Sequence, residues 1–273
     1  MPCCWDGLTA RMISAAGFPL TFMSGFAVAA GRLGLPDTGL TSFGEMVDQA
    51  RQITSAATIP VIGDGDTGYG NPLNVQRTVR EYARAGLAAV MIEDQVSPKR
   101  CGHTEGKTVV DRSEAIERIE AAVEVRRQGT DIMILARTDA RATHGLDEAF
   151  YRAEAFKRAG ADILFIEAPQ TLEELAEIPR AVRGVHMANM IEGGVTPVVP
   201  PAQLHELGYR IAAYPLALLS AAMLNMQRAL EQLAAGEPCG DLLMDFASVR
   251  REVGFDEYAK RESALLARRG DVE

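Results

Sequence analysis

Aromatic residues and positive charge are both scarce in this chain of 273 residues. Aromatics make up 6% of the sequence, so Ala, Leu, Val and Ile must fill the core. The net charge is −9, from 28 Lys and Arg against 37 Asp and Glu. Nucleic acids and anionic membranes bind surfaces with clustered Lys and Arg, so we expect neither as a partner. The negative net charge does not exclude a small acidic substrate, because a single Arg in the binding site can bind it.

Long hydrophobic runs and patterned cysteines are also missing. No run approaches the roughly 18 apolar residues that a membrane-spanning helix needs. The four cysteines, Cys3, Cys4, Cys101 and Cys239, show neither zinc-ligand spacing nor a C-x-x-C pair. The first ten residues lack the basic start and apolar core of a signal peptide. We therefore expect reduced thiols and a cytoplasmic protein.

Short hydrophobic runs alternate with longer amphipathic stretches along the chain. Each run has four to six Val, Ile, Leu or Met-rich positions, which predicts strands buried on both faces. The runs cover residues 19–25, 59–66, 88–94, 131–139, 162–169, 185–190 and 210–215, with a weaker one near residues 1–5. Helical periodicity that ends at a glycine marks the stretches 74–86, 112–129, 145–160 and 171–184. The pattern predicts a β-α unit repeated about eight times.

Polar residues fall at the ends of nearly all these predicted strands, which favours a closed (β/α)8 barrel over an open doubly wound sheet. They are Ser24, Asp64, Asp66, Glu93, Asp94, Arg137, Asp139, Glu167 and Asn189. An open sheet would concentrate such residues at one switch point, and no G-x-G-x-x-G follows the first strand. We assign residues 1–235 to the catalytic barrel and 236–273 to a helical tail, with a helix break at 234–241.

The stretch GDGDTGYG, residues 63–70, carries two carboxylates at a strand end. On an extended strand Asp64 and Asp66 would point the same way, and Glu93 ends the next strand. Converging carboxylates form the hard-oxygen site that Mg²⁺ prefers. The alternative is an Asp-Gly turn with a structural role only.

Arg137 also stands at a strand end, where a guanidinium can bind a substrate carboxylate through two parallel hydrogen bonds. The alternative for Arg137 is a salt bridge to Glu93 or Glu167 across the mouth of the barrel. Glu167 and Asn189 add an acid and an amide at later strand ends, although such residues are often only caps.

The stretch PKRCGHTEGK, residues 98–107, lies on a loop of about eighteen residues, a length typical of functional loops. Its glycines and charges suit a lid that closes on a ligand. Lys99, Arg100 and His103 would lower the pKa of the Cys101 thiol, so that it could act as an acid or base. The alternative is a cysteine that occurs by chance on a solvated loop.

Several of these stretches, in this order, resemble the isocitrate lyase/phosphoenolpyruvate mutase superfamily over about residues 2–235. They are SGFAVAA (24–30), LGLPDTGL (33–40), GDGDTGYGN (63–71), IEDQ (92–95), PKRCGH (98–103), ARTDA (136–140), FIEAP (165–169) and ANMIEGG (188–194). KRCGH resembles the signature of the lyase branch, and the mutases, phosphonopyruvate hydrolases and oxaloacetate decarboxylases lack its cysteine. Within that branch the chain most resembles the dimethylmalate lyase and petal-death-protein group, often labelled carboxyvinyl-carboxyphosphonate phosphorylmutase.

The resemblance implies a (β/α)8 barrel whose last helix swaps onto a neighbouring subunit, in a homotetramer built from dimers. It implies catalytic roles for Cys101 as the acid, Arg137, His103 and Glu93. It implies substrate contacts from Ser24, Gly25, Phe26, Gly102, Arg137, Glu167 and Asn189. It implies a Mg²⁺ site, open to Mn²⁺ as well, formed by Asp64, Asp66, Asp37 and Glu93.

The activity implied is Mg²⁺-dependent retro-aldol cleavage of a small di-acid, a substituted 2-hydroxy acid, to a 2-oxo acid and a carboxylic acid. Methylisocitrate lyases carry an Arg where this chain has Ser220 in YPLALLS (214–220), which disfavours a tricarboxylate substrate. Oxaloacetate hydrolases of the family are expected to need a Ser near Pro215. The rivals are therefore a hydrolase or decarboxylase of a 2-oxo diacid such as oxaloacetate, a methylisocitrate lyase, and a non-enzymatic barrel. Which group takes the hydroxyl proton stays open.

Overall fold

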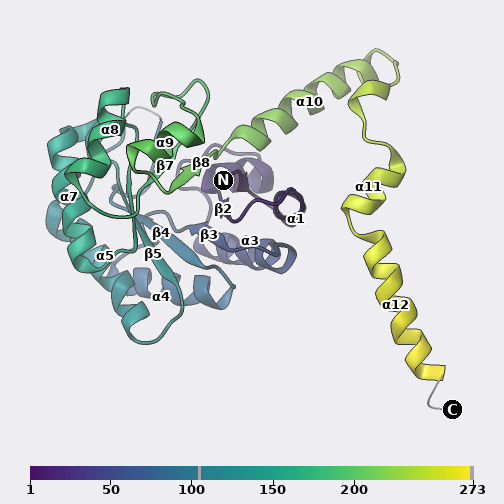
Figure 1. Cartoon of the computed structure of the whole chain (residues 1–273), viewed down its shortest axis with the longest axis horizontal. Helices are drawn as coiled ribbons and strands as arrows, with labels where there is room; N and C mark the ends of the chain where they lie inside the picture. Colours follow the sequence, from purple (N-terminus) through teal and green to yellow (C-terminus); the bar gives the residue numbers. More distant parts are fainter. Residues whose placement is uncertain (104–105, 271–273) are drawn as a thin grey trace. The chain divides into compact units, whose positions relative to one another are not determined.

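The computed structural model describes residues 1–103 and 106–270, and its first compact unit has parallel strands surrounded by helices (Figure 1). The strands are β1 (Cys3–Cys4), β2 (Thr21–Met23), β3 (Val61–Asp64), β4 (Ala89–Glu93), β5 (Met133–Thr138), β6 (Ile163–Ile166), β7 (Met187–Asn189) and β8 (Ile211–Ala213). Each predicted hydrophobic run contains one of these strands, including the weak first run. The strand predictions are therefore confirmed.

The strands follow one another around a closed ring. Strands β1 to β6 pair in sequence order, and β7 pairs with β8. A parallel bridge between Leu164 and His186 joins β6 to the chain entering β7. A second parallel bridge, between Pro2 and Tyr214, joins the end of β8 to the start of β1. The predicted (β/α)8 barrel is confirmed, because two bridges close what would otherwise be separate sheets.

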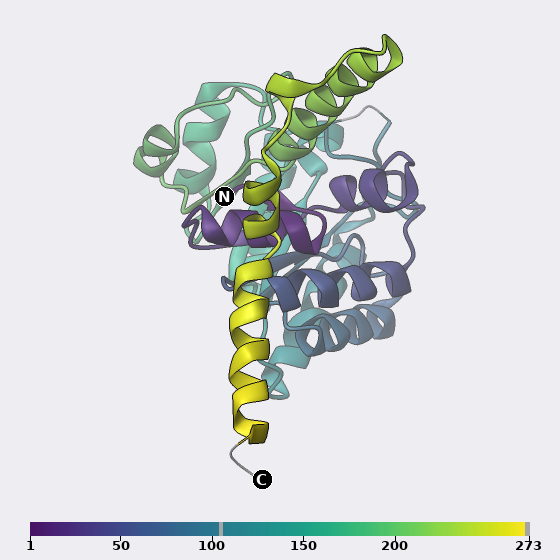
Figure 2. The same ribbon diagram turned by 90° about the vertical axis from the view of Figure 1, so that its right-hand side faces the viewer.

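Helices cover the outside of the ring, and neighbouring helices such as α3, α4 and α5 pack side by side (Figures 1 and 2). Those of the first unit are α1 (Gly7–Ala15), α2 (Gly25–Val28), the π-helix η1 (Ala29–Leu33), α3 (Phe43–Ala56), α4 (Pro72–Arg84), α5 (Arg112–Arg127), α6 (Ala140–His144), α7 (Leu146–Ala159), α8 (Leu172–Ala181) and α9 (Pro201–Leu207). The sequence of helix α4 shows why it begins where it does: Asn71 caps the helix and Pro72 is its first residue. Its residues Val75, Val79 and Tyr82 are buried, as predicted.

The core has two layers. One cluster fills the space between the strands and the outer helices. A second cluster, contributed by every strand, fills the barrel interior, because alternate strand residues point inward. Its members Cys3, Phe22, Met91, Phe165 and Met187 form the apolar floor of the cavity at the carboxyl ends of the strands.

The chain from Ser220 onward forms a second compact unit. It holds most of α10 (Ala217–Ala234), the 3-10 turn η2 (Gly240–Leu242), α11 (Phe246–Glu252) and α12 (Phe255–Gly270). Helix α10 ends inside the predicted break at 234–241, and Asn225 on α10 donates to the Leu242 carbonyl over 3.1 Å. Among the described residues, no helix is long and apolar enough to cross a membrane.

Candidate active site

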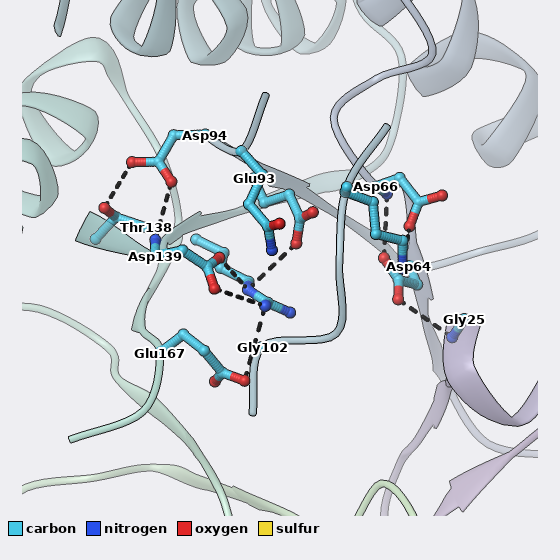
Figure 3. Close-up of polar contacts among 12 residues, drawn as sticks. Gly25, Asp64, Asp66, Glu93, Asp94, Gly102, Thr138, Asp139 and Glu167 are labelled. Atoms are coloured by element: carbon cyan, nitrogen blue, oxygen red, sulfur yellow. Dashed lines mark hydrogen bonds and ion pairs between the residues drawn. The ribbon is translucent and has the colours of Figure 1, made fainter. Parts of the chain in front are cut away.

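Asp64, the last residue of β3, is held by backbone donors (Figure 3). The Gly25 N–H donates to Oδ2 over 3.1 Å, and the Asp66 N–H donates to Oδ1 over 3.1 Å. The Tyr82 hydroxyl donates to the Asp64 carbonyl over 2.7 Å, which fixes the strand end from the helix side. This carboxylate therefore has a defined position at the mouth of the barrel.

Asp66 reaches the same region by a route that differs from the prediction. It does not continue the strand, because its φ of 47° puts it in the left-handed region of a turn. Its Oδ1 lies 2.9 Å from Lys99 Nζ, and the same ammonium lies 2.6 Å from Asp37 Oδ1. Burial raises the pKa of Asp66 to about 6, against the opposing effect of Lys99.

The acids predicted to bind metal do not form a protein cage. Within the described part of the chain, no three His, Cys, Asp or Glu residues are placed to hold a metal ion by themselves. Glu93 is buried, its Oε1 lacks a hydrogen-bond partner among the described residues, and burial raises its pKa well above the ordinary value. Such a carboxylate needs a partner. The arrangement fits a hydrated divalent cation that takes few direct protein ligands and several waters.

Arg137, at the end of β5, forms ion pairs with three acids. Its Nε lies 2.8 Å from Asp139 Oδ2 and 3.3 Å from Glu93 Oε2, and its Nη2 lies 3.7 Å from Glu167 Oε1. The salt bridges that the sequence left as an alternative are therefore present. Arg137 also lines the cavity, and its binding of a substrate carboxylate stays a prediction.

Residues 97–103 and 106–107, here called the lid loop, follow and precede a short two-stranded stem. Gln95 and Val109 form an antiparallel bridge, and the Val96 N–H donates to the Thr108 carbonyl over 2.9 Å. The Gln95 side chain then exchanges two hydrogen bonds of 2.9 Å with the backbone of Arg100. This contact fixes Arg100, and residues 100–103 line the cavity.

His103 joins the lid loop to the later strand ends. Its Nδ1 accepts the Val195 N–H over 3.2 Å, so a neutral ring carries its hydrogen on Nε2. That Nε2 lies 3.5 Å from Glu167 Oε1. Burial lowers the pKa of His103, against the opposing effect of Glu167. Asn189 Nδ2 approaches the same carboxylate at 3.3 Å, so Glu167 is where these elements meet.

The predicted lowering of the Cys101 pKa is wrong. Burial is the largest effect and raises the pKa of this thiol, and the Glu167 carboxylate raises it further. Lys99, one of the three residues expected to lower this pKa, is instead paired with Asp37 and Asp66. The thiol therefore stays protonated near neutral pH, which suits a proton donor rather than a nucleophile.

Two of the predicted substrate donors are already engaged. The Ser24 N–H donates to the Cys4 carbonyl, and the Gly25 N–H donates to Asp64. The Ser24 hydroxyl accepts the Ala27 N–H and still carries a hydrogen of its own to donate. Phe26 lines the cavity directly.

One cavity brings most of the predicted site residues together. Those that line it are Ser24, Phe26, Asp37, Asp64, Cys101, Gly102, His103, Arg137, Glu167 and Asn189. Gly25, Asp66 and Glu93 contact the residues that line it. The site therefore combines carboxylates, a guanidinium, an amide and a thiol around one cavity.

The comparisons with known proteins agree with this geometry. The sequence model of the phosphoenolpyruvate phosphomutase family matches residues 1–234. The chain belongs to this family, within the isocitrate lyase/phosphoenolpyruvate mutase superfamily. It is 44% identical over 260 residues to 2,3-dimethylmalate lyase of Eubacterium barkeri, covering 94% of this chain and 90% of that protein. It is 42% identical to petal death protein of Dianthus caryophyllus, covering 96% of this chain and 84% of that protein.

Solved structures of family members resemble the whole chain. A crystal structure of 2,3-dimethylmalate lyase matches with a TM-score of 0.92 at 40% identity, covering 97% of this chain and 89% of that one. A structure of oxaloacetate acetylhydrolase with 3,3-difluorooxalacetate matches with a TM-score of 0.91 at 33% identity, covering 97% and 91%. Both are proteins that this chain is similar to, and they differ in the reaction that their names state.

The sequence analysis did not identify the buried polar groups that lie beneath the cavity of this protein. Asp94 accepts the Thr138 hydroxyl over 2.6 Å and the Asp139 N–H over 2.9 Å, and it pairs with Arg152 over 3.1 Å. Lys107, which the sequence places only on the loop 98–107, is buried against Asp139. Asp94 and Asp139 were visible as strand-end acids, but no local pattern reveals which partner a long side chain reaches.

Proposed function

We propose that this protein is a Mg²⁺-dependent carbon–carbon lyase that cleaves a substituted malate to a 2-oxo acid and a carboxylic acid. One observation carries the proposal: the Cys101 thiol, Asp64 and Arg137 line the same cavity, and the raised pKa of the thiol supports a role as a proton donor. Cleavage of a bond next to a carboxylate leaves a carbanion, and a nearby acid must protonate it. The names of the similar 2,3-dimethylmalate lyase and 2-methylisocitrate lyases support a lyase reaction.

Asp64 is the residue that would hold the cation directly, with Asp66, Asp37 and Glu93 acting through water. The unpartnered Glu93 oxygen and the raised pKa of Asp66 support this assignment. A divalent cation bound there would lower the pKa of a substrate hydroxyl and polarise its carboxylate. Mn²⁺ has the same preference for oxygen ligands and should substitute for Mg²⁺.

Arg137 and Cys101 would then act on the reacting carbons. Asp139 and Glu93 hold the Arg137 guanidinium in one orientation, so it can bind substrate oxygens without reorganising. Cys101 would transfer its proton to the carbanion, and His103 would hold the lid against Glu167 during that step. Excluding water by lid closure protects the carbanion from other proton sources.

The walls of the cavity favour an alkyl-substituted substrate. Ile191, Pro215 and Leu216 line it, and these three side chains carry no charge. Leu218 and Leu219 of the same segment are not among its lining residues. An unpaired third carboxylate would cost several kcal/mol to desolvate there, whereas each buried alkyl carbon contributes roughly 0.8 kcal/mol. We therefore favour substrates of the 2,3-dimethylmalate type.

A second candidate is hydrolysis of a 2-oxo diacid, supported by the similarity to oxaloacetate acetylhydrolase. The expected serine is missing, because residue 215 is Pro. The test is incubation with Mg²⁺ and each candidate diacid, with 2-oxo acid release followed by a coupled assay. Release from a malate supports the lyase. Oxalate from oxaloacetate, with no cleavage of any malate, would replace the lyase by the hydrolase, and no product from either would favour a non-enzymatic barrel.

We also propose a homotetramer, a dimer of dimers in which the C-terminal helices pack on a neighbouring subunit. Helix α10 exposes Met223, Leu224, Met226, Leu230 and Leu233, and α12 exposes further apolar residues, which supports burial in an assembly. Light scattering after size-exclusion chromatography would measure the mass directly. Among the described residues no two cysteines form a disulfide, which supports a reducing, cytoplasmic location.

A further inference from the structure

Lys107, at the far end of the lid loop, has a buried ammonium between the lid and the barrel. Its side chain is 4% exposed. The Nζ atom donates to Asp139 Oδ1 over 3.0 Å and also to the Gly102 carbonyl. One cation therefore links the residue that follows Cys101 to the carboxyl end of β5.

The acceptor at the barrel end is rigid. Asp139 is fully buried, and its carboxylate binds Arg137 through Nε at 2.8 Å and Nη2 at 3.0 Å. Its own N–H donates to Asp94 over 2.9 Å, so the backbone is fixed as well. Oδ1 of Asp139 thus serves both Arg137 and Lys107. The lid is fastened to the same carboxylate that orients the guanidinium.

We propose that Lys107 is a positioning residue that fastens the lid loop to Asp139 and thereby holds Cys101 and Gly102 over the cavity. Its importance for turnover rests on the lyase function proposed above, whereas its effect on the lid does not. Gly102 needs this accuracy, because it lies so close to Arg137 and Glu167 that even a methyl group would overlap them. Loss of the ammonium would leave the Gly102 carbonyl without this donor and free the lid to open.

A merely structural role for Lys107 predicts something different. Asp139 keeps two hydrogen bonds from Arg137 when Lys107 is removed, and its pKa, lowered to about 2, reflects Arg137 before Lys107. The barrel should therefore stay folded in Lys107→Met, while the lid opens more often. Lys107→Arg keeps the charge and should restore the link. Lys157→Met is a matched control, because Lys157 is 40% exposed on α7 and pairs only with the surface residue Glu154 in the described contacts.

The experiment is alkylation of the full-length protein by iodoacetamide at pH 8 with Mg²⁺ present. Trypsin releases Cys101 in residues 101–107 of wild type and Lys107→Arg, and in residues 101–112 of the Met and Gln variants, and mass spectrometry follows its modification. We expect Lys107→Met to react about tenfold faster than wild type, with Lys107→Arg within about threefold and Lys157→Met unchanged. Circular dichroism and Tm check the fold.

An unchanged rate in folded Lys107→Met would overturn the proposal, as would equal acceleration in Lys107→Arg. If Lys107→Met does not fold, Lys107→Gln replaces it, and a wild-type rate in that folded variant would overturn the proposal equally. In turnover assays kcat should fall about thirtyfold while KM changes less than about threefold, because the lid closes after binding. Faster alkylation in a protein that cleaves no malate would support the lid role and refute only the proposed function.

Discussion

The backbone N–H of Gly25 lies 3.1 Å from Asp64 Oδ2, and a Cβ atom added at Gly25 would lie 2.5 Å from that same oxygen. The carboxylate lies so close to the Gly25 backbone that it can accept this hydrogen bond only where residue 25 has no side chain. A real Cβ does not approach a heavy atom that closely, so any other residue would displace the carboxylate. The start of α2 therefore sets the position of the acid proposed to bind metal.

Gly25→Ala should consequently weaken metal binding without unfolding the barrel. We expect Mn²⁺ affinity, measured by electron paramagnetic resonance, to fall at least about tenfold, as for other changes that reorient a ligand. Gly44→Ala is the control: nothing lies within 4 Å of its Cβ, and in helix α3 it should add about 0.5–1 kcal/mol of stability. Wild-type Mn²⁺ affinity in Gly25→Ala would contradict the assignment of Asp64.

Gly102→Ala tests the closed position of the lid. The new methyl group would overlap Glu167 Oε1 and lie 2.5 Å from Arg137 Nη2, so the lid must move outward. A displacement of about 1 Å costs roughly a hundredfold in turnover, and we expect a loss of that size. The Tm should stay near that of wild type, because the lid contributes little to the core. Retention of most activity would mean that the lid does not close as described.

The thiol of Cys101 should react more slowly than a free cysteine. Because burial raises its pKa, the thiolate becomes abundant only above the ordinary range, and alkylation should rise steeply at alkaline pH. A rate profile from pH 6 to 10, read from the peptide CGHTEGK, measures this. An inflection below pH 8 would contradict a buried, protonated thiol.

Replacement of the same thiol tests its chemical role. Cys101→Ser keeps a donor of similar shape, but a hydroxyl gives up its proton far less readily, so turnover should fall by at least about a hundredfold. Binding of a 2-oxo acid product, measured by calorimetry, should be retained. A serine variant with near wild-type turnover would make Cys101 a bystander.

Removal of the metal should abolish turnover and lower stability together. Burial raises the pKa of both Glu93 and Asp66, and the nearby Asp64 carboxylate raises both further, so a bound cation should stabilise their charged forms. At a hundredfold excess over its dissociation constant, Mg²⁺ should stabilise the fold by about 2.7 kcal/mol. Scanning calorimetry in chelator and in Mg²⁺ measures the effect. Full turnover in excess chelator, or a Tm independent of Mg²⁺, would refute the metal assignment.

The sequence predicted the barrel because a parallel sheet buried on both faces leaves continuous hydrophobic runs. It placed β3 and β4 correctly, with Asp64 and Glu93 at their ends. It misjudged Asp66, because a positive φ in a turn is set by tertiary contacts and leaves no periodic signal. Residue spacing therefore predicted the direction of a side chain only where the chain continues as a regular strand.

The lid shows a second limit of sequence reasoning. Lys99, Arg100 and His103 near Cys101 suggested a lowered thiol pKa, but the Lys99 ammonium pairs with Asp37 and Asp66 instead. Long flexible side chains choose partners far along the chain, and burial of the thiol then dominates its pKa. The number of charged residues in a loop therefore does not determine the electrostatic potential at the sulfur of one cysteine.

The substrate ranking tests the central claim most directly. It compares kcat/KM, with Mg²⁺ present, for 2,3-dimethylmalate, malate, 2-methylisocitrate, isocitrate and oxaloacetate. Two buried methyl groups contribute roughly 1.6 kcal/mol, so we predict that 2,3-dimethylmalate is cleaved about tenfold better than malate. It should also exceed both tricarboxylates and oxaloacetate, because Pro215 and Leu216 offer no partner for a further charge. First place for 2-methylisocitrate or oxaloacetate, or no 2-oxo acid from any malate, would contradict the account.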